Sequence, residues 1–208
     1  IPAPAGEAAT AALISGIRQL GLAALPFGRQ GEHLLQRLRF LAKAYGPPWP
    51  DLCDAALLAS LESWLAPYLP GVTGLAAIEP QILSEAVRAL VPAELRGRID
   101  ELAPTHFEAP SGSRVPIRYE AGEPVLSIRV QELFGLTTHP SIAGGRLKLT
   151  VELLSPAHRP IQITRDLPGF WAGSWSDVRA DLRGRYPKHS WPQDPASAEA
   201  TARAKPRR

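Results

Sequence analysis

The chain has 208 residues, of which 45% are hydrophobic and 21% charged, and its formal net charge is +3. This composition is typical of a folded soluble protein, and no apolar run approaches the 18 residues of a membrane-spanning helix, so we expect no membrane contact. The single cysteine, Cys53, excludes an internal disulfide and fits a reducing compartment, which predicts a cytoplasmic protein. Cys53 itself is expected to be a small core residue.

Positive charge is concentrated at the C-terminal end. Residues 178–208 contain eight Lys or Arg and three Asp or Glu, which gives this stretch a net charge of +5. Such asymmetry favours an anionic partner, most commonly nucleic acid, although a solvated disordered end explains residues 196–208 equally well. The sequence begins at Ile1 and contains no methionine. We therefore expect it to be part of a larger protein.

The first half of the sequence has the apolar spacing of helices. This pattern predicts helices over residues 8–20, 31–45, 54–69, 80–91 and 93–102. Gly21 and Gly46 are expected to end the first two, and Asp51, after the proline-rich stretch 47–50, is a candidate cap for the third.

From residue 104 the pattern changes to the alternation of β-strands. Two extended runs flank a turn at residues 110–113, and further runs follow at 125–130, 146–155 and 159–166, where Ile161 and Ile163 are expected to point inward. One or two helical turns at 131–136 separate the third run from the fourth, and a helix is predicted over 173–186.

This order of elements predicts an α+β fold. An N-terminal helical bundle (1–103) is followed by a small antiparallel β-barrel with a closing helix (104–195) and a basic, disordered tail (196–208). Five strands with a helix between the third and fourth are the order of an oligonucleotide-binding (OB) barrel. Sandwiches and SH3-like barrels also consist of short antiparallel strands, so those alternatives stay open.

Sequence motifs for catalysis are missing. None of the four lysines follows a glycine, which excludes a phosphate-binding P-loop, and neither a dinucleotide fingerprint nor a nucleophile elbow is present. His106 and Glu108 reproduce the H-x-E of zinc deaminases, but the second half of that motif needs two cysteines. We predict no enzyme activity, metal or cofactor for this chain, with a site assembled only in three dimensions left open.

Arginines recur along the predicted strands and in the motif RGRYPKHSWP at residues 183–192. On the outer face of a sheet they would line a basic groove for a phosphate backbone, with aromatic side chains stacking on unpaired bases. The candidate nucleic-acid-binding residues are Arg114, Arg118, Arg129, Arg146, Arg159, Arg165, Trp171, Arg183, Arg185, Tyr186, Lys188 and Trp191.

A structural interpretation of the same residues is also open. Arg118 and Arg129 would then form ion pairs with Glu120, Glu123 or Glu132, while Trp171 and its aromatic neighbours would close one end of the barrel. The motif at 183–192 would be a strap, anchored by Tyr186 and Trp191, whose basic side chains face water.

Several long segments resemble the C-terminal region of bacterial HrpB-type ATP-dependent helicases, which are DEAH-box (DExH) RNA helicases. The segments are LLSPAHRPIQITRDLPGFWAGSW, RGRYPKHSWPQDP and the terminal RAKPRR, together with PSGSRVPIRY and RVQELFGL. FLAKAYGPPWPDL and LESWLAPYL extend the likeness into the helical half. The resemblance is dense over 103–195 and looser before it.

The resemblance implies a parent protein that hydrolyses ATP with Mg²⁺ in two RecA-like domains and remodels nucleic acid. None of its ATPase motifs lies in this sequence, and the resemblance supplies no site residues. Two functions follow as hypotheses. One is an accessory module that binds single-stranded RNA or DNA. The other is a structural module that docks on the parent's helicase core or recruits a partner through an apolar patch, for which Trp49, Trp64 and Tyr68 are candidates.

Overall fold

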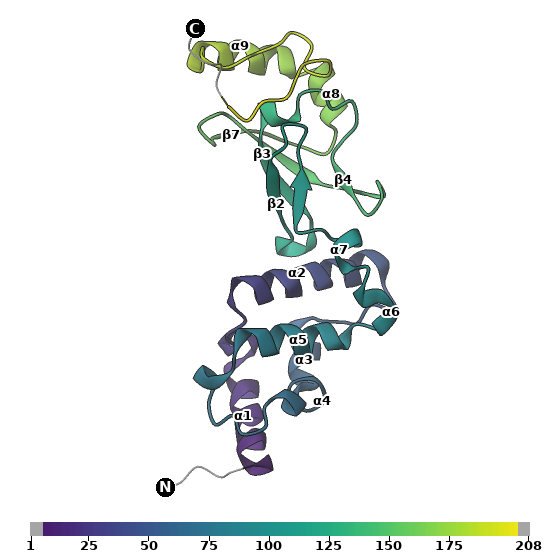
Figure 1. Cartoon of the computed structure of the whole chain (residues 1–208), viewed down its shortest axis with the longest axis vertical. Helices are drawn as coiled ribbons and strands as arrows, with labels where there is room; N and C mark the ends of the chain where they lie inside the picture. Colours follow the sequence, from purple (N-terminus) through teal and green to yellow (C-terminus); the bar gives the residue numbers. More distant parts are fainter. Residues whose placement is uncertain (1–5, 204–208) are drawn as a thin grey trace. The chain divides into compact units, whose positions relative to one another are not determined.

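The computed structural model describes residues 6–203. The chain divides into two compact units, Ile1–Ile99 and Asp100–Arg208. The first unit is helical, and the second combines a five-stranded sheet with two helices (Figure 1). The predicted α+β class is confirmed. Within residues 6–203, no helix has the length and apolar character needed to cross a membrane.

Three longer helices build the first unit. They are α1 (Glu7–Leu20), α2 (Gly28–Tyr45) and α5 (Pro80–Leu90), and each buries one apolar stripe. Gly21 and Gly46 end α1 and α2 with φ angles of 87° and 65°, a region that favours glycine. Shorter elements fill the remainder: η1 (Leu22–Ala24), α3 (Asp54–Ala59), α4 (Leu61–Trp64), η2 (Ala66–Tyr68), η3 (Leu75–Ala77) and α6 (Ala93–Arg96), with α7 (Ile99–Leu102) at the boundary of the two units.

The helix predicted over 54–69 is broken into α3, α4 and η2. The break lies at Ser60, whose hydroxyl donates to the carbonyl of Ala56 at 2.8 Å, and such back-bonding by serine competes with helix continuation. The helix predicted over 93–102 is likewise divided into α6 and α7.

Two predictions for the first unit, one about Cys53 and one about an apolar patch, are wrong. Cys53 is exposed and caps α3, where its sulfur accepts a hydrogen bond from the Ala56 N–H at 3.4 Å. Trp49 and Trp64 are 7% and 2% exposed, and the Trp64 indole donates to the Leu57 carbonyl. Because both rings are buried in the core, they do not form an exposed apolar patch with Tyr68.

The second unit contains an open sheet with the strand order β1-β2-β3-β6-β7. The strands are β1 (His106–Glu108), β2 (Arg114–Arg118), β3 (Val125–Arg129), β6 (Thr150–Leu154) and β7 (Pro160–Thr164). The pair β3–β6 is parallel and the other three are antiparallel. Among the described residues β1 and β7 are not paired with each other, so the predicted closed antiparallel barrel is not found.

The parallel pair β3–β6 explains the segment between these strands. Parallel neighbours require a crossover connection, and residues 130–149 provide it, beginning with η5 (Val130–Leu133). A further short element, η4 (Glu120–Gly122), lies between β2 and β3. A two-stranded hairpin, β4 (Ser141–Ile142) with β5 (Leu147–Lys148), completes the crossover. Sequence analysis predicted the helical turns here but not the hairpin.

The alternation predicted for the central strands is confirmed. Leu126 and Ile128 of β3 and Val151 and Leu153 of β6 are buried, and the residues between them are half-exposed. The prediction for Ile163 is wrong, because this side chain is 64% exposed. Ile163 pairs with Glu152 on the outer face of the sheet, and a register shift between Leu153 and Leu154 marks an irregularity in the pairing with β7.

Two helices and an aromatic cluster lie at one end of the second unit (Figure 1). The helices are α8 (Leu167–Ala172), which sequence analysis did not predict, and α9 (Trp175–Arg185), which it did. The ring centroid of Trp175 lies 5.5 Å from that of Phe134 and 5.5 Å from that of Trp171. Trp191 joins the cluster from the C-terminal segment at 6.4 Å. These rings form the core at the α9 end of the unit.

Candidate nucleic-acid interface

Residues 186–203 form an irregular segment, here called the C-terminal strap, that packs beside α9 and η5 (Figure 1). Its backbone is held at several points. The Trp175 indole donates to the Pro192 carbonyl at 3.0 Å, and Arg179 donates to the Trp191 carbonyl at 2.9 Å. The N–H of Gly135 donates to the Pro195 carbonyl at 2.9 Å, and that of Thr201 donates to the Gln131 carbonyl at 3.0 Å.

The strap includes part of the tail predicted over 196–208. Its residues 196–203 are described and carry the bond from Thr201. The cations Lys205, Arg207 and Arg208 lie outside the described residues.

The two candidate tryptophans lie in the core. Trp171 and Trp191 are 9% and 8% exposed, and their indole nitrogens donate to the carbonyls of Leu136 at 3.0 Å and Tyr186 at 2.9 Å. A base cannot stack on a ring whose faces are already packed against protein. The structure therefore corrects the stacking role predicted for both, and their rings serve as anchors.

Tyr186 lies at the start of the strap and is half-buried. Its hydroxyl is 3.3 Å from the hydroxyl of Ser155, in the turn between β6 and β7. The same serine oxygen accepts the N–H of Arg159 at 3.1 Å, and the Ser155 N–H donates to the Arg159 carbonyl at 2.8 Å. Tyr186 thereby connects the strap to the turn that carries Arg159.

Four of the candidate arginines have acidic partners. On the outer face of the sheet, Arg118 lies 2.6 Å from Glu152 and 3.8 Å from Glu120. The remaining ion pairs are Arg114–Glu108 at 2.8 Å, Arg129–Glu132 at 2.8 Å and Arg185–Asp181 at 2.9 Å. The pairs Arg118–Glu120 and Arg129–Glu132 are those of the structural interpretation, and they reduce the positive charge that the sheet presents to a phosphate backbone.

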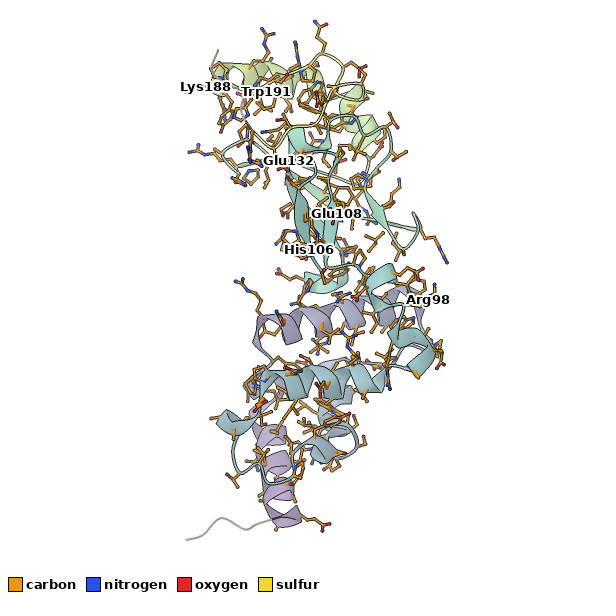
Figure 2. All side chains as sticks on the ribbon, in the orientation of Figure 1. Arg98, His106, Glu108, Glu132, Lys188 and Trp191 are labelled. Carbon is orange, nitrogen blue, oxygen red and sulfur yellow. The ribbon has the colours of Figure 1, made fainter. Side chains whose placement is uncertain are left out.

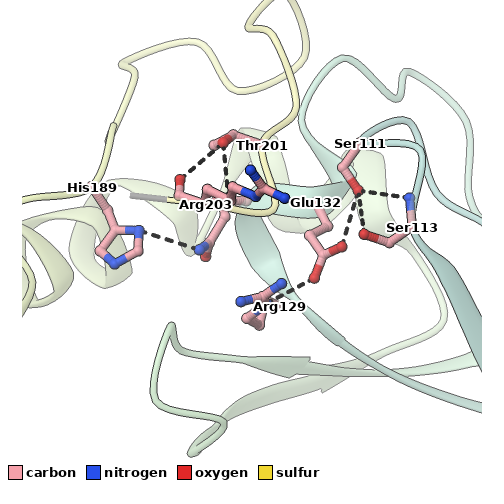
Figure 3. A network of polar contacts seen from close by, with 8 residues as sticks. Ser111, Ser113, Arg129, Glu132, His189, Thr201 and Arg203 are labelled. Atoms are coloured by element: carbon pink, nitrogen blue, oxygen red, sulfur yellow. Dashed lines mark hydrogen bonds and ion pairs between the residues drawn. The ribbon is translucent and has the colours of Figure 1, made fainter. Parts of the chain in front are cut away.

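The pair Arg129–Glu132 belongs to a buried network (Figure 3). The Glu132 carboxylate is 5% exposed and also accepts a hydrogen bond from the Ser111 hydroxyl at 2.9 Å. Burial alone would raise the pKa of Glu132, but hydrogen bonds from Ser113, Arg129 and Ser111 outweigh it and lower the pKa below its ordinary value. This charged carboxylate joins the β1–β2 turn to η5.

Gln131 and His189 extend this region toward the strap. The Gln131 side chain is fully buried, and its amide nitrogen lies 3.4 Å from Nδ1 of His189. Burial, with a smaller contribution from Arg129, lowers the pKa of His189. A neutral imidazole at position 189 can accept the amide proton, which keeps the strap next to η5.

Five candidate cations have no acidic partner within 4 Å among residues 6–203 and are exposed: Arg146, Arg159, Arg165, Arg183 and Lys188. Arg183 and Lys188 lie within three residues of Tyr186, and Arg159 lies in the turn that Ser155 begins, so all three are close in sequence to the contact of Tyr186 with Ser155. We call these three residues the basic corner. Figure 2 shows Lys188 beside α9, well separated from Glu108 and His106 on β1. Arg146 is the last residue of the turn between β4 and β5, and Arg165 follows β7 at the end opposite to Arg159.

His139 lies near that other end and was not a candidate from sequence. Its Nδ1 accepts the N–H of Leu167 at 3.0 Å, and its Nε2 donates to the Leu149 carbonyl at 2.7 Å. Burial lowers the pKa of His139, and the nearby positive charges of Lys148 and Arg165 lower it further. The neutral ring therefore connects the start of α8 to Leu149, the residue before β6. Among the described residues, no three His, Cys, Asp or Glu side chains come together as a metal site.

Comparison with known protein families gives a match that spans the boundary between the two units. The family model described as "ATP-dependent helicase C-terminal" matches residues 64–195. The chain belongs to this family of helicase C-terminal domains. It is 46% identical over 198 residues to the ATP-dependent RNA helicase HrpB of Escherichia coli K12, covering 93% of this chain and 24% of that protein.

Two solved structures are similar to this member of the helicase C-terminal family. A crystal structure of the E. coli DExH-box NTPase HrpB matches 94% of the chain at 44% identity with a TM-score of 0.84. A structure of the Escherichia coli DEAH/RHA helicase HrpB matches 90% at 41% identity with a TM-score of 0.72. In both, the chain covers 24% of the other protein, so it spans about a quarter of the length of the relatives it matches.

Proposed function

We propose that this chain is a non-catalytic accessory domain of an ATP-dependent RNA helicase and that its basic corner binds the phosphate backbone of single-stranded nucleic acid. The parent protein would bind ATP and Mg²⁺ and hydrolyse ATP in domains outside this chain. The helicase core would be the domain's partner within the same protein, in the cytoplasm. The observation that supports the proposal is a set of three exposed cations that have no acidic partner within 4 Å among residues 6–203 and that are close in sequence to the two residues of one strap contact.

The basic corner differs from the sheet in its electrostatics. On the sheet, Arg114, Arg118 and Arg129 face carboxylates at 2.6–2.8 Å, so their charge is largely neutralised. Arg159, Arg183 and Lys188 carry uncompensated charge on exposed side chains, and such groups bind phosphates by releasing condensed counterions. No ring has to stack for this mode of binding, which agrees with the burial of Trp171 and Trp191. The contact would be insensitive to base sequence.

Fluorescence anisotropy of a labelled single-stranded oligouridine, titrated with the chain across a salt series, tests the proposal. The variant Arg183→Gln/Lys188→Gln should bind more weakly, and the slope of log affinity against log salt should become shallower by about 1.4, or 0.7 for each phosphate contact. The control variant Arg29→Gln/Arg88→Gln removes the same charge from exposed positions of the helical unit.

The outcomes separate the two functions. An unchanged slope in the Arg183→Gln/Lys188→Gln variant, or an equal effect in the control, contradicts the basic corner as the binding site. If the chain does not bind RNA even at low salt, the domain instead serves as a structural module that docks on the helicase core. Limited proteolysis would then compare the isolated chain with the whole parent protein. Slower cleavage of the chain within the parent would support docking.

A further inference from the structure

The strand β7 forms one edge of the sheet and exposes an apolar side chain. It pairs with β6 on one side only among the described residues, so its other side presents backbone groups without a strand partner. Ile163, the fourth of the five residues of β7, is 64% exposed and is one of three large apolar side chains exposed in residues 6–203. An exposed apolar residue on an open edge is the arrangement that extended peptides recognise by adding a strand.

Two arginines flank the edge. Arg159 and Arg165 stand immediately before and after β7, six residues apart, which is about 20 Å along an extended strand. Both are exposed, and neither has an acidic partner within 4 Å among the described residues. At the Arg165 end, Lys148 is a second positive charge near His139, and Asp166 is the one negative charge that acts on this histidine among the described residues.

The charges of Arg159 and Arg165 determine which kind of strand can pair with the β7 edge. A second copy of β7 paired antiparallel about Gln162 would set each Arg159 opposite an Arg165, and parallel pairing would bring identical arginines side by side. Like charges directly opposite each other destabilise a strand pair. A strand with acidic residues at both ends meets opposite charges instead.

We propose that the β7 edge binds an extended polypeptide segment with acidic residues about six positions apart and β-branched apolar residues between them. The backbone of the segment would hydrogen-bond to β7, one apolar side chain would cover Ile163, and the acids would pair with Arg159 and Arg165. The site differs from the basic corner in using Ile163 and Arg165, which the proposed nucleic-acid contact does not require.

The probe is a synthetic peptide, acetyl-Glu-Thr-Val-Thr-Val-Thr-Glu-amide, titrated into the ¹⁵N-labelled 208-residue chain and followed by ¹H–¹⁵N NMR. The amides of Gln162, Ile163 and Thr164 should shift at about 1 mM peptide, and a peptide with lysine in place of both glutamates should not shift them. Ile163→Thr keeps the charge and the strand propensity but removes the anchor, and we expect it to weaken binding about tenfold. Leu20→Thr, at an equally exposed apolar residue of α1, is the matched control and should bind as the unmodified chain does.

Three results would overturn the proposal. The first is the absence of β7 amide shifts with the acidic peptide, or equal shifts with both peptides. The second is a concentration-dependent shift of the same amides without peptide, which would identify a second copy of the chain as the occupant. The third is a shift of the Gln162 and Thr164 amides by oligouridine that both Ile163→Thr and Arg183→Gln/Lys188→Gln leave unchanged, which would assign the edge, rather than the basic corner, to nucleic acid.

Discussion

The hydroxyl of Tyr186 lies 3.3 Å from the hydroxyl of Ser155, which is 31 residues earlier in the chain, and this contact joins the C-terminal strap to the β6–β7 turn. Ser155 is 3% exposed and bonds to the backbone of Arg159 through both its N–H and its hydroxyl. The position of Arg159 therefore depends on a buried serine.

The two hydroxyls should contribute unequally to stability. Tyr186→Phe removes one long hydrogen bond, and we expect it to lower the free energy of unfolding by about 0.5 kcal/mol. Ser155→Ala also leaves the Arg159 N–H without its acceptor, so we expect a loss of about 1.5 kcal/mol. Urea denaturation of both variants measures the difference. Equal losses would show that the bond from Arg159 contributes nothing.

Glu132→Gln tests the buried network. The substitution removes the charge that Arg129 and Ser111 stabilise, and we expect a loss of about 2 kcal/mol at pH 7. Glu108→Gln, in the exposed pair with Arg114, is the control and should change stability by less than about 0.5 kcal/mol.

The pH dependence of the Glu132→Gln effect has a defined sign. The folded pKa of Glu132 lies below the ordinary value of 4.5, so its stabilisation is complete above 4.5 and is lost as pH falls through the folded pKa. The difference between Glu132→Gln and the unmodified chain should therefore shrink between pH 6 and pH 3. A difference that stays constant over this range would contradict the charged role of Glu132.

The lowered pKa of His139 predicts a second pH dependence of stability, at higher pH than that of Glu132. Because burial lowers its folded pKa below 6.5, the unfolded chain takes up a proton first, and stability falls as pH decreases below 6.5. His189 contributes with the same sign. In His139→Gln, which we expect to cost about 1 kcal/mol at pH 7, the fall in stability between pH 7 and pH 5 should be smaller. Thermal unfolding at a series of pH values checks this, and an unchanged slope would show that His139 does not titrate in this range.

Local patterns predicted the elements but not how the strands assemble. The period of the apolar residues identified α1, α2, α5, β3 and β6, since each buries one face regardless of its partner. Whether five short strands close into a barrel depends on long-range pairing, and no local pattern indicates that β3 and β6 lie side by side in parallel. The prediction that Ile163 points inward failed for the same reason. The position of β7 at the edge and its irregular register are properties of the whole sheet.

The candidate site was predicted from residue types, and the structure corrected it by showing the hydrogen-bond and ion-pair partners of those residues. Sequence analysis chose arginines by their alternation, but only the structure shows which of them face carboxylates, as Arg118 faces Glu152 across β3. Ser155 and His139 carried no signal, because their roles come from hydrogen bonds to residues that are not adjacent in sequence. The basic motif at 183–192 was the most informative segment, and it proved to combine a buried anchor, Trp191, with the exposed Lys188.

Trp191→Leu separates these two parts of the motif. The substitution removes the indole bond to the Tyr186 carbonyl and leaves space in the aromatic cluster, so we expect a loss of about 2–4 kcal/mol in the free energy of unfolding. RNA affinity, measured by anisotropy at a temperature where circular dichroism shows the variant folded, should stay within about twofold, whereas Lys188→Gln should lower affinity without changing stability. A ring that stacked on a base would contribute about 1–3 kcal/mol to binding. A tenfold loss of RNA affinity in folded Trp191→Leu would therefore show that Trp191 contacts RNA and that the strap moves when RNA binds.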